Sequence, residues 1–332
     1  MKLPLLLFPI ALVVGCTAKL PDETAEGLTP IVLQTDWYPQ PEHGGFYQAL
    51  LDGGYRGAGM DVEIRPGANV QGIYQLVATG RVQFSIGTSD NLLAAIARDL
   101  PLVGVAAYFQ HDPQCVMVHA SSDVHRLEDL DGRNVMIGPS LNYVEYLRRS
   151  LDIRINVLPL DWSLVRFVAD PSFIQQCFVT SEPYYVRQKG IEPRVLPLWE
   201  SGFDPYRVVY TSRDFAASHP DLVRRFTAAT LEGWRTFMSG DRSATLDHIA
   251  KLNPQHSSES MAWTVEQMRA YHLTDGFAER GEALGRIARE RLETQIAQLA
   301  KLDLLERTIA ADEVFVGDAS QALAHHEERT GE

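Results

Sequence analysis

The sequence predicts a two-lobed α/β protein with a helical C-terminal segment. The chain has 332 residues, which is longer than a typical single domain, so two lobes are expected. From Ile31 to Ser212, short apolar runs alternate with helical segments, as in parallel βαβ units. After Arg213, four stretches carry apolar residues at a spacing near 3.6, which predicts helices.

The first cycle of elements runs to residue 109. Gly80 is suited to close a helix, and Ser89-Asp90 is suited to open one, because these residue types are common at the respective helix ends. We expect strands at 30–36, 60–66, 82–88 and 102–109, and helices at 43–54, 69–80 and 89–99.

The second cycle repeats the alternation and is followed by the helical segment. A short helix, a turn and a strand are expected within 127–138, further strands at 115–120, 154–160, 172–180, 193–198 and 206–212, and helices at 140–151, 163–170 and 181–190. The helices after Arg213 are expected at 219–240, 241–253, 257–272 and 282–305.

These cycles divide the chain into two lobes. We expect the chain to cross between the lobes near residue 118 and to return near 208. Lobe I then comprises 30–117 plus 208–325, and lobe II comprises 118–207.

The N-terminus reads as a secretory signal. Lys2 gives a positive start, residues 3–14 are almost all apolar, and this run is too short to span a bilayer. The ending "VVGC" is similar to a bacterial lipobox, so residues 1–16 are expected to be a signal cleaved before a lipid-modified Cys16. Cleavage without lipid is the alternative. Residues 17–29 are polar and are expected to form a flexible tether.

Composition excludes some functions. The net charge of −13 argues against a nucleic-acid partner, which normally needs a basic surface. Cys115 and Cys177 lie in apolar stretches and are expected to be buried free thiols, with a disulfide as the alternative in an oxidising compartment. There is no CxxC motif and no Cys/His spacing for zinc, and no metal or cofactor is expected.

Polar and aromatic residues follow several predicted strands, where ligands of two-lobed α/β proteins bind. Five stretches meet this condition: 36–50, 87–90, 108–114, 138–143 and 180–185. The candidate ligand-binding residues within them are Trp37, His43, Gly45, Tyr47, Thr88, Ser89, Tyr108, Gln110, Ser140, Asn142, Glu182 and Tyr184.

Each stretch also has a purely structural interpretation. Trp37 and Phe46 could be core residues, His43 could bond the backbone at a helix start, and Gln110 could bond a loop. Ser89 and Ser140 could be simple helix caps, and Glu182 could interact with the N-terminus of its own helix. The equivalent placement of all five stretches nevertheless favours a cleft.

The chemistry of the five stretches suggests the ligand. Trp37 and the tyrosines could sandwich a flat ring, and Glu182 could accept hydrogen bonds from an N–H-rich edge such as that of an aminopyrimidine. No Arg or Lys occurs in these stretches. A sulfonate, phosphate or carboxylate would usually require a cation there, so we expect a neutral or weakly cationic aromatic ring.

The sequence resembles a known family in the stretches "DWYPQPEHGGFYQA", "GAGMDVEIRPG", "LVATGRVQFSIGTSD", "YFQHDPQCVMVH", "LEDLDGRNVMIGPS" and "VTSEPYYVRQKG". They look like periplasmic solute-binding proteins related to the thiamine-pyrimidine biosynthesis enzymes, which are grouped with the nitrate, sulfonate and taurine binding proteins of ABC importers. The resemblance covers roughly residues 30–240. It implies a type II periplasmic-binding fold that closes on its solute and delivers it to an ABC permease and its ATPase.

The resemblance also implies roles for particular residues. Trp37, His43, Gly45 and Tyr47 match a family pattern that often accompanies binding of a pyrimidine precursor of thiamine, and Glu182 matches a carboxylate that can face the ring. The expectation is therefore a monomeric binding protein, lipid-anchored in the periplasm or at the cell surface. A riboflavin-like solute, an aromatic acid and an aliphatic sulfonate are the alternative ligands. A sensory or interaction protein is an alternative function.

The family also contains an enzyme that builds the pyrimidine from pyridoxal phosphate and its own histidine. That enzyme carries a Cys-rich run, and a Lys and a His after the third strand. Here the corresponding segment reads "IGTSDNLLAA", without Lys or His. Because a Schiff-base lysine is needed to hold the aldehyde, we expect this chain not to be an enzyme.

Overall fold

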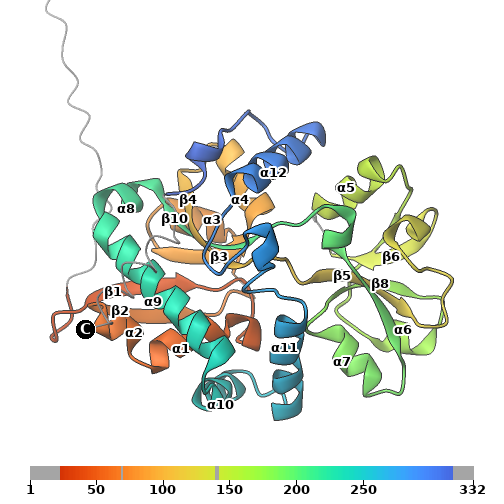
Figure 1. Ribbon diagram of the computed structural model, residues 1–332, viewed down its shortest axis with the longest axis horizontal. Helices are drawn as coiled ribbons and strands as arrows, with labels where there is room; N and C mark the ends of the chain where they lie inside the picture. Colours follow the sequence, from red (N-terminus) through yellow and green to blue (C-terminus); the bar gives the residue numbers. More distant parts are fainter. Residues whose placement is uncertain (1–22, 69, 139–141, 317–332) are drawn as a thin grey trace, which may run out of the picture.

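Two five-stranded sheets form the centres of two lobes in the computed structural model (Figure 1). The structure describes residues 23–68, 70–138 and 142–316. The signal segment and Cys16 therefore lie outside the described residues, as do residues 17–22 of the tether. The two lobes confirm the predicted α/β fold class.

The first sheet has the strand order β2-β1-β3-β10-β4. Its central strands are almost fully buried, as expected for apolar runs covered by helices on both faces. Its strands are β1 (Thr29–Gln34), β2 (Met60–Arg65), β3 (Phe84–Thr88), β4 (Leu102–Phe109) and β10 (Arg207–Ser212).

The second sheet has the order β7-β6-β8-β5-β9. It is built between the two crossings of the chain. Its strands are β5 (Gln114–His119), β6 (Asn134–Ile137), β7 (Asn156–Pro159), β8 (Ile174–Phe178) and β9 (Pro193–Pro197).

One strand in each sheet runs against the predicted parallel arrangement. β10 is antiparallel to β3 and β4, and β5 is antiparallel to β8 and β9. Both reversed strands are the first strand after a crossing, so they enter their sheet from the other lobe. The first crossing lies at 110–113, because β5 already belongs to the second sheet, rather than near residue 118.

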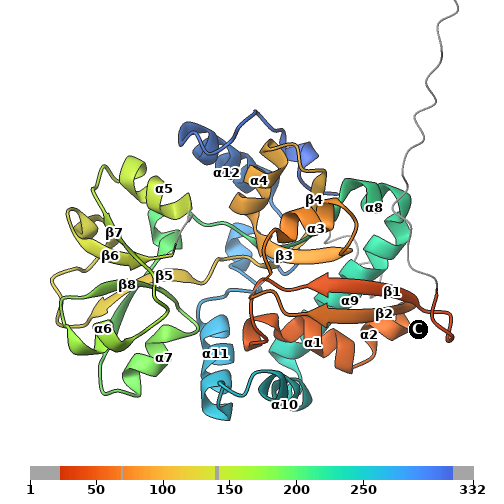
Figure 2. The same ribbon diagram turned by 180° about the vertical axis from the view of Figure 1, so that it is seen from behind.

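Helices surround both sheets (Figures 1 and 2). No described helix is long and apolar enough to cross a membrane. The helices are α1 (Gly44–Leu51), α2 (Gly54–Gly57), α3 (Ile73–Ala78), α4 (Ser89–Ala97), α5 (Asn142–Ser150), α6 (Val165–Ala169), α7 (Glu182–Arg187), α8 (Arg213–Ser218), α9 (Pro220–Ser239), α10 (Ser243–Leu252), α11 (Ser258–Ala270) and α12 (Arg289–Lys301). Short 3-10 helices span Pro41–His43, Leu127–Leu130, Leu198–Ser201, Ala278–Arg280 and Ala311–Glu313.

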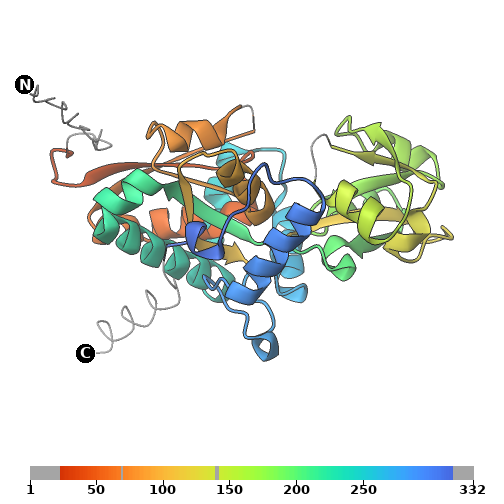
Figure 3. The ribbon, with the colours of Figure 1, turned by 90° about the horizontal axis from the view of Figure 1, so that it is seen from above.

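The C-terminal segment covers the free edge of β4. Two isolated β-bridges join β4 to this segment, Gly104 to Phe315 and Ala107 to Gly285. The open side of this edge strand is therefore paired. The helix expected at 282–305 begins later, at Arg289, because Gly285 with φ of 86° belongs to the bridge. Figure 3 shows α12 lying across the molecule, where it contacts α4.

A partly buried ionic cluster joins the two crossing segments to this C-terminal segment. The ring nitrogens of His111, on the first crossing, lie 2.7 Å from Asp204 and 3.1 Å from Glu282. Arg291 lies 2.8 Å from Asp204 and 3.3 Å from Glu282. Because Asp204 is on the second crossing, the cluster fixes both connections between the lobes.

Cys115 and Cys177 form a disulfide, so the expectation of free thiols was wrong. The two residues face each other in the antiparallel pair of β5 and β8, with Cα atoms 4.9 Å apart. Both are buried in the centre of the second sheet. The pairing arises because β5 enters the sheet in reverse beside β8, which the spacing of the cysteines does not reveal.

We predict that this disulfide contributes substantially to stability. It closes a loop of 62 residues, and loss of such a cross-link typically costs about 2–4 kcal/mol by enlarging the unfolded ensemble. Denaturant unfolding of the double variant Cys115→Ala/Cys177→Ala should show that loss, and a reductant should destabilise only the wild type. Equal unfolding free energies for the wild type with and without reductant would contradict the prediction.

Candidate ligand cleft

A cavity of about 510 Å³ lies between the two lobes, within the size range of small-molecule sites. Both sheets contribute to it, and each of the five predicted stretches supplies part of its lining. Those residues are Asp36, Trp37 and Gln40 from the first stretch, Gly87, Thr88 and Asp90 from the second, Asp112 and Gln114 from the third, Gly138, Asn142 and Tyr143 from the fourth, and Ser181 and Glu182 from the fifth.

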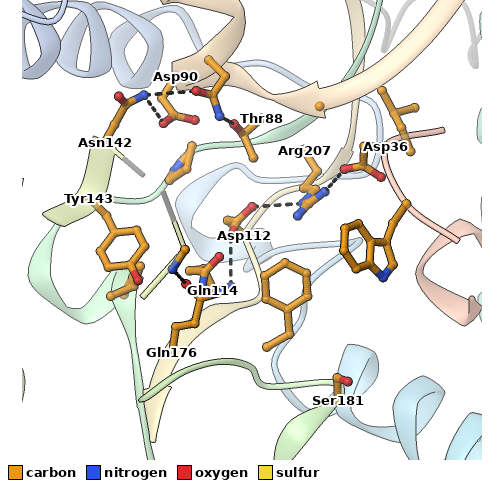
Figure 4. A pocket seen from close by; sticks show the side chains of 18 of the residues that line it. Asp36, Thr88, Asp90, Asp112, Gln114, Asn142, Tyr143, Gln176, Ser181 and Arg207 are labelled. Carbon is orange, nitrogen blue, oxygen red and sulfur yellow. Dashed lines mark hydrogen bonds and ion pairs between the residues drawn. The ribbon is translucent and has the colours of Figure 1, made fainter. Parts of the chain in front are cut away.

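An arginine shared by two carboxylates lies in the cavity wall (Figure 4). The Nε of Arg207 lies 3.0 Å from Asp112 Oδ2, and its Nη1 lies 2.5 Å from Asp36 Oδ2. Asp36 follows β1, Asp112 follows β4, and Arg207 begins β10. The three side chains therefore join three strand ends.

The two carboxyl groups titrate differently. Burial acts to raise the pKa of Asp36, but Arg207 and His43 outweigh burial and bring that pKa to about 2. Burial raises the pKa of Asp112, and the opposing effect of Arg207 is smaller. Asp36 is thus the firmly ionised partner of Arg207.

Arg207 was not among the predicted site residues, because those were all chosen from segments that follow strands. β10 is antiparallel, so its first residue lies at the edge where its neighbours end. Arg207 pairs with Thr88, the last residue of β3, and with Phe109, the last residue of β4. Recognising the strand after the second crossing as reversed would have pointed to Arg207.

Aromatic side chains provide flat walls. Tyr74 and Tyr210 stack with ring centroids 5.0 Å apart, and both line the cavity. Trp37 of the first lobe lies 4.9 Å from Trp162 of the second lobe, centroid to centroid. Trp162 adopts a left-handed backbone with φ of 60° and is 66% exposed, so it sits at the rim rather than in a core.

Asp90 and Glu182 present acceptor oxygens to the cavity. Asn142 donates to Asp90 Oδ2 at 2.7 Å, whereas Asp90 Oδ1 is buried without a partner among the described residues. Glu182 Oε2 accepts from the backbone N–H of Phe178 at 2.7 Å. Burial raises the pKa of Glu182 to about 7. These oxygens could accept hydrogen bonds from a ligand.

The lobes are bridged on either side of the cavity. The Asn142–Asp90 hydrogen bond joins α5 to α4, and the hydroxyl of Thr180 donates to Glu42 at 2.6 Å. With the pair of Trp37 and Trp162, these contacts hold the two lobes together around the enclosed space.

Four of the predicted site residues line the cavity: Trp37, Thr88, Asn142 and Glu182. Ser140 lies outside the described residues. The remaining seven described candidates are placed elsewhere, and each has a structural contact that accounts for its position.

Three of these seven belong to the first stretch but do not line the cavity. His43 is buried, and its Nε2 lies 3.1 Å from Asp36 Oδ1, so it supports the Arg207 ion pairs. Gly45 packs at the α1–α9 contact, where a Cβ would lie 2.2 Å from the Trp234 ring. Tyr47 is buried against α10, beside His248.

The other four are also engaged in packing. The Ser89 hydroxyl donates to Gln295 of α12, and Gln110 donates to the backbone of Ala283 and Arg286. The Tyr108 ring is buried and stacks on Trp234 at 5.4 Å, and Tyr184 contacts Trp263 on α11 at 5.6 Å. Ser89 and Gln110 thus hold the C-terminal segment rather than line the cavity.

The charge of the lining favours ligands rich in hydrogen-bond donors. Asp36, Asp90, Asp112 and Glu182 contribute carboxyl groups, whereas Arg207 is the one cationic side chain among the described lining residues. No described group of three or more His, Cys, Asp or Glu residues could hold a metal ion.

Comparisons with known sequences identify related proteins. A family model described as NMT1/THI5 like matches residues 40–242. The formylaminopyrimidine-binding protein of Halalkalibacterium halodurans is 29% identical over 325 residues, covering 95% of this chain and 97% of the relative.

Solved structures share the fold at low sequence identity. The periplasmic aliphatic sulphonate binding protein SsuA from Escherichia coli has a TM-score of 0.67 at 13% identity, covering 87% of this chain and 92% of that chain. The desulfurization enzyme DSZB has a TM-score of 0.57 at 14% identity, covering 89% of this chain and 99% of that chain. These likenesses confirm the predicted periplasmic-binding fold.

We predict that Glu182 makes ligand-free stability fall as pH rises from 4.5 to about 7. The folded protein holds the proton of the Glu182 carboxyl more tightly than the unfolded chain does, so the protonated carboxyl contributes to the free energy of unfolding. Its contribution is therefore complete below pH 4.5 and is lost as pH rises through about 7. Denaturant unfolding across this range should show a smaller decline for Glu182→Gln than for the wild type. Parallel declines would contradict the raised pKa.

Proposed function

Because the chain belongs to the NMT1/THI5-like family, we propose that it is the substrate-binding component of an ABC importer that binds a small planar heterocycle. The proposed solute is a pyrimidine precursor of thiamine. The observation that carries this proposal is the combination of carboxyl groups, among them Asp90 with one unpaired oxygen, with aromatic walls in a cavity of about 510 Å³. A flat ring with exocyclic N–H groups matches both features.

The side chains suggest how such a ring would bind. Trp37 provides a stacking face, and Glu182 accepts hydrogen bonds from the N–H edge of the ring. Asp90 Oδ1 can accept one further hydrogen bond, while Thr88 and Asn142 are placed to contact ring substituents. Similarity to a formylaminopyrimidine-binding protein over nearly the whole chain supports this ligand class.

An aliphatic sulfonate fits the lining less well. The sulphonate-binding protein shares the fold at 13% identity, which does not transfer its ligand. Here four carboxyl groups line the cavity, and Arg207 is already paired with two of them. A sulfonate would meet net negative charge, which opposes its binding.

We propose that the chain binds its solute without chemical conversion. The fold also occurs in an enzyme, so fold alone does not decide between binding and catalysis. None of the described residues that line the cavity is a lysine, which a Schiff-base mechanism on pyridoxal phosphate would require.

The proposed location is the periplasm or the cell surface, with Cys16 as the lipid anchor. The basic start, the apolar run and the lipobox-like ending at Cys16 support it. The partners would be an ABC permease and its ATPase. We propose that the protein acts as a monomer, because a single chain supplies both lobes of the cavity.

We predict that formylaminopyrimidine and other 4-aminopyrimidines raise the melting temperature, whereas aliphatic sulfonates and aromatic acids do not. Ligand bound only by the folded state stabilises it, so the shift reports binding. A response to sulfonates or aromatic acids without one to aminopyrimidines would contradict the proposed ligand.

We also predict that Glu182→Gln weakens aminopyrimidine binding by roughly 1.5–3 kcal/mol, the usual value for a hydrogen bond to a charged group. Isothermal titration calorimetry measures this loss. Glu42→Gln is the matched control, because Glu42 is a nearby buried carboxyl that does not line the main cavity, and Gln can still accept from Thr180. Unchanged affinity in Glu182→Gln would remove Glu182 from the site.

A further inference from the structure

The pairing of Arg207 has a consequence for the charge of the ligand. A buried arginine facing a cavity is normally a ready site for a carboxylate, sulfonate or phosphate, because its planar N–H groups match such anions. Here Arg207 is 12% exposed, and two carboxylates occupy its Nε and Nη1 sides. The guanidinium is therefore neutralised within the protein before any ligand arrives.

We propose that Asp36 and Asp112 are specificity-determining residues that exclude anionic ring ligands by pairing with Arg207, and that this restricts the solute to neutral or cationic heterocycles. The identification of the ring as an aminopyrimidine rests on the proposed function. The exclusion of anions rests on the geometry around Arg207 alone.

Both carboxylates are fixed by second hydrogen bonds. Asp112 Oδ1 accepts from the backbone N–H of Gln114 at 2.9 Å. Asp36 Oδ1 lies 3.1 Å from Nε2 of the buried His43. Neither carboxylate can swing away from Arg207 without breaking its second contact as well.

An anionic ligand would have to displace one of these carboxylates to reach Arg207. The displaced carboxylate would remain partly buried and unpaired, which is more costly than the pairing that it loses. Asp90 and Glu182 line the same cavity and add further negative charge. A neutral ring does not have to displace a carboxylate and is not repelled by negative charge, because its N–H groups need acceptors rather than a cation.

Two isosteric substitutions test the proposal. Asp36→Asn and Asp112→Asn each remove one negative charge beside Arg207 and keep the size of the side chain. Calorimetry would compare two matched ligands: 4-amino-2-methylpyrimidine with a 5-hydroxymethyl group, and the same ring with a 5-carboxylate. The wild type should bind the carboxylate at least about tenfold more weakly than the neutral ring. Each variant should bind the carboxylate about tenfold or more tightly than the wild type does, as expected when a charged hydrogen bond becomes available.

Two control variants separate release of Arg207 from a general loss of negative charge. Asp90→Asn removes a carboxylate that lines the same cavity but does not pair with Arg207. Its increase in affinity for the carboxylate ligand should therefore be smaller than that of either test variant. Adding Arg207→Gln to the double variant Asp36→Asn/Asp112→Asn should abolish the gain. Melting temperatures confirm that each variant is folded, and either single variant alone is sufficient for the test.

The outcomes distinguish this proposal from the proposed function. Unchanged affinity for the carboxylate ligand in either folded single variant would overturn the exclusion of anions, even if the wild type binds the neutral ring. The exclusion of anions would also be overturned if Asp90→Asn increased the affinity for the carboxylate ligand equally, or if the increase persisted after Arg207→Gln. If the wild type binds neither ring but the test variants gain the carboxylate ligand, the exclusion of anions holds and the proposed solute is wrong.

Discussion

The cleft depends on one partly buried interaction, the sharing of Arg207 between Asp36 and Asp112. These residues stand at the ends of β1, β4 and β10, so the interaction joins three strands at the edge of the sheet that faces the second lobe. The reversed direction of β10 is what brings a cation to this edge. His43 extends the network through its contact with Asp36. The acceptors and aromatic walls of the cavity surround the guanidinium of Arg207, which is paired with the carboxyl groups of Asp36 and Asp112.

Strand and helix positions were largely predictable because each element carries a clear periodicity. All five stretches chosen from the ends of predicted strands contribute to the cavity, since chain direction alone places them there. Side-chain direction was not predictable in the same way. Ser89 and Gln110 follow strands but bond the C-terminal segment, whose position depends on the far end of the chain. Arg207 was overlooked, so the cavity contains a cation that the five stretches did not predict, and this cation is paired with Asp36 and Asp112.

The disulfide between Cys115 and Cys177 was mispredicted for a related reason. Strand β5 enters the second sheet directly from the first lobe and runs antiparallel to β8, which places the two cysteines opposite each other. Gln114 and Phe178, which are the neighbours of these cysteines in sequence, line the cavity. The cross-link therefore lies directly behind one wall of the cleft and fixes the register of the two strands that form it.

The most direct measurement is a crystal structure of the protein with formylaminopyrimidine bound. The structure should show the ring between the lobes against Trp37, with its N–H edge within hydrogen-bonding distance of Glu182 and with Arg207 still paired to Asp36 and Asp112. A ligand bound outside this cavity, or one held by Arg207 after displacement of either carboxylate, would contradict the account.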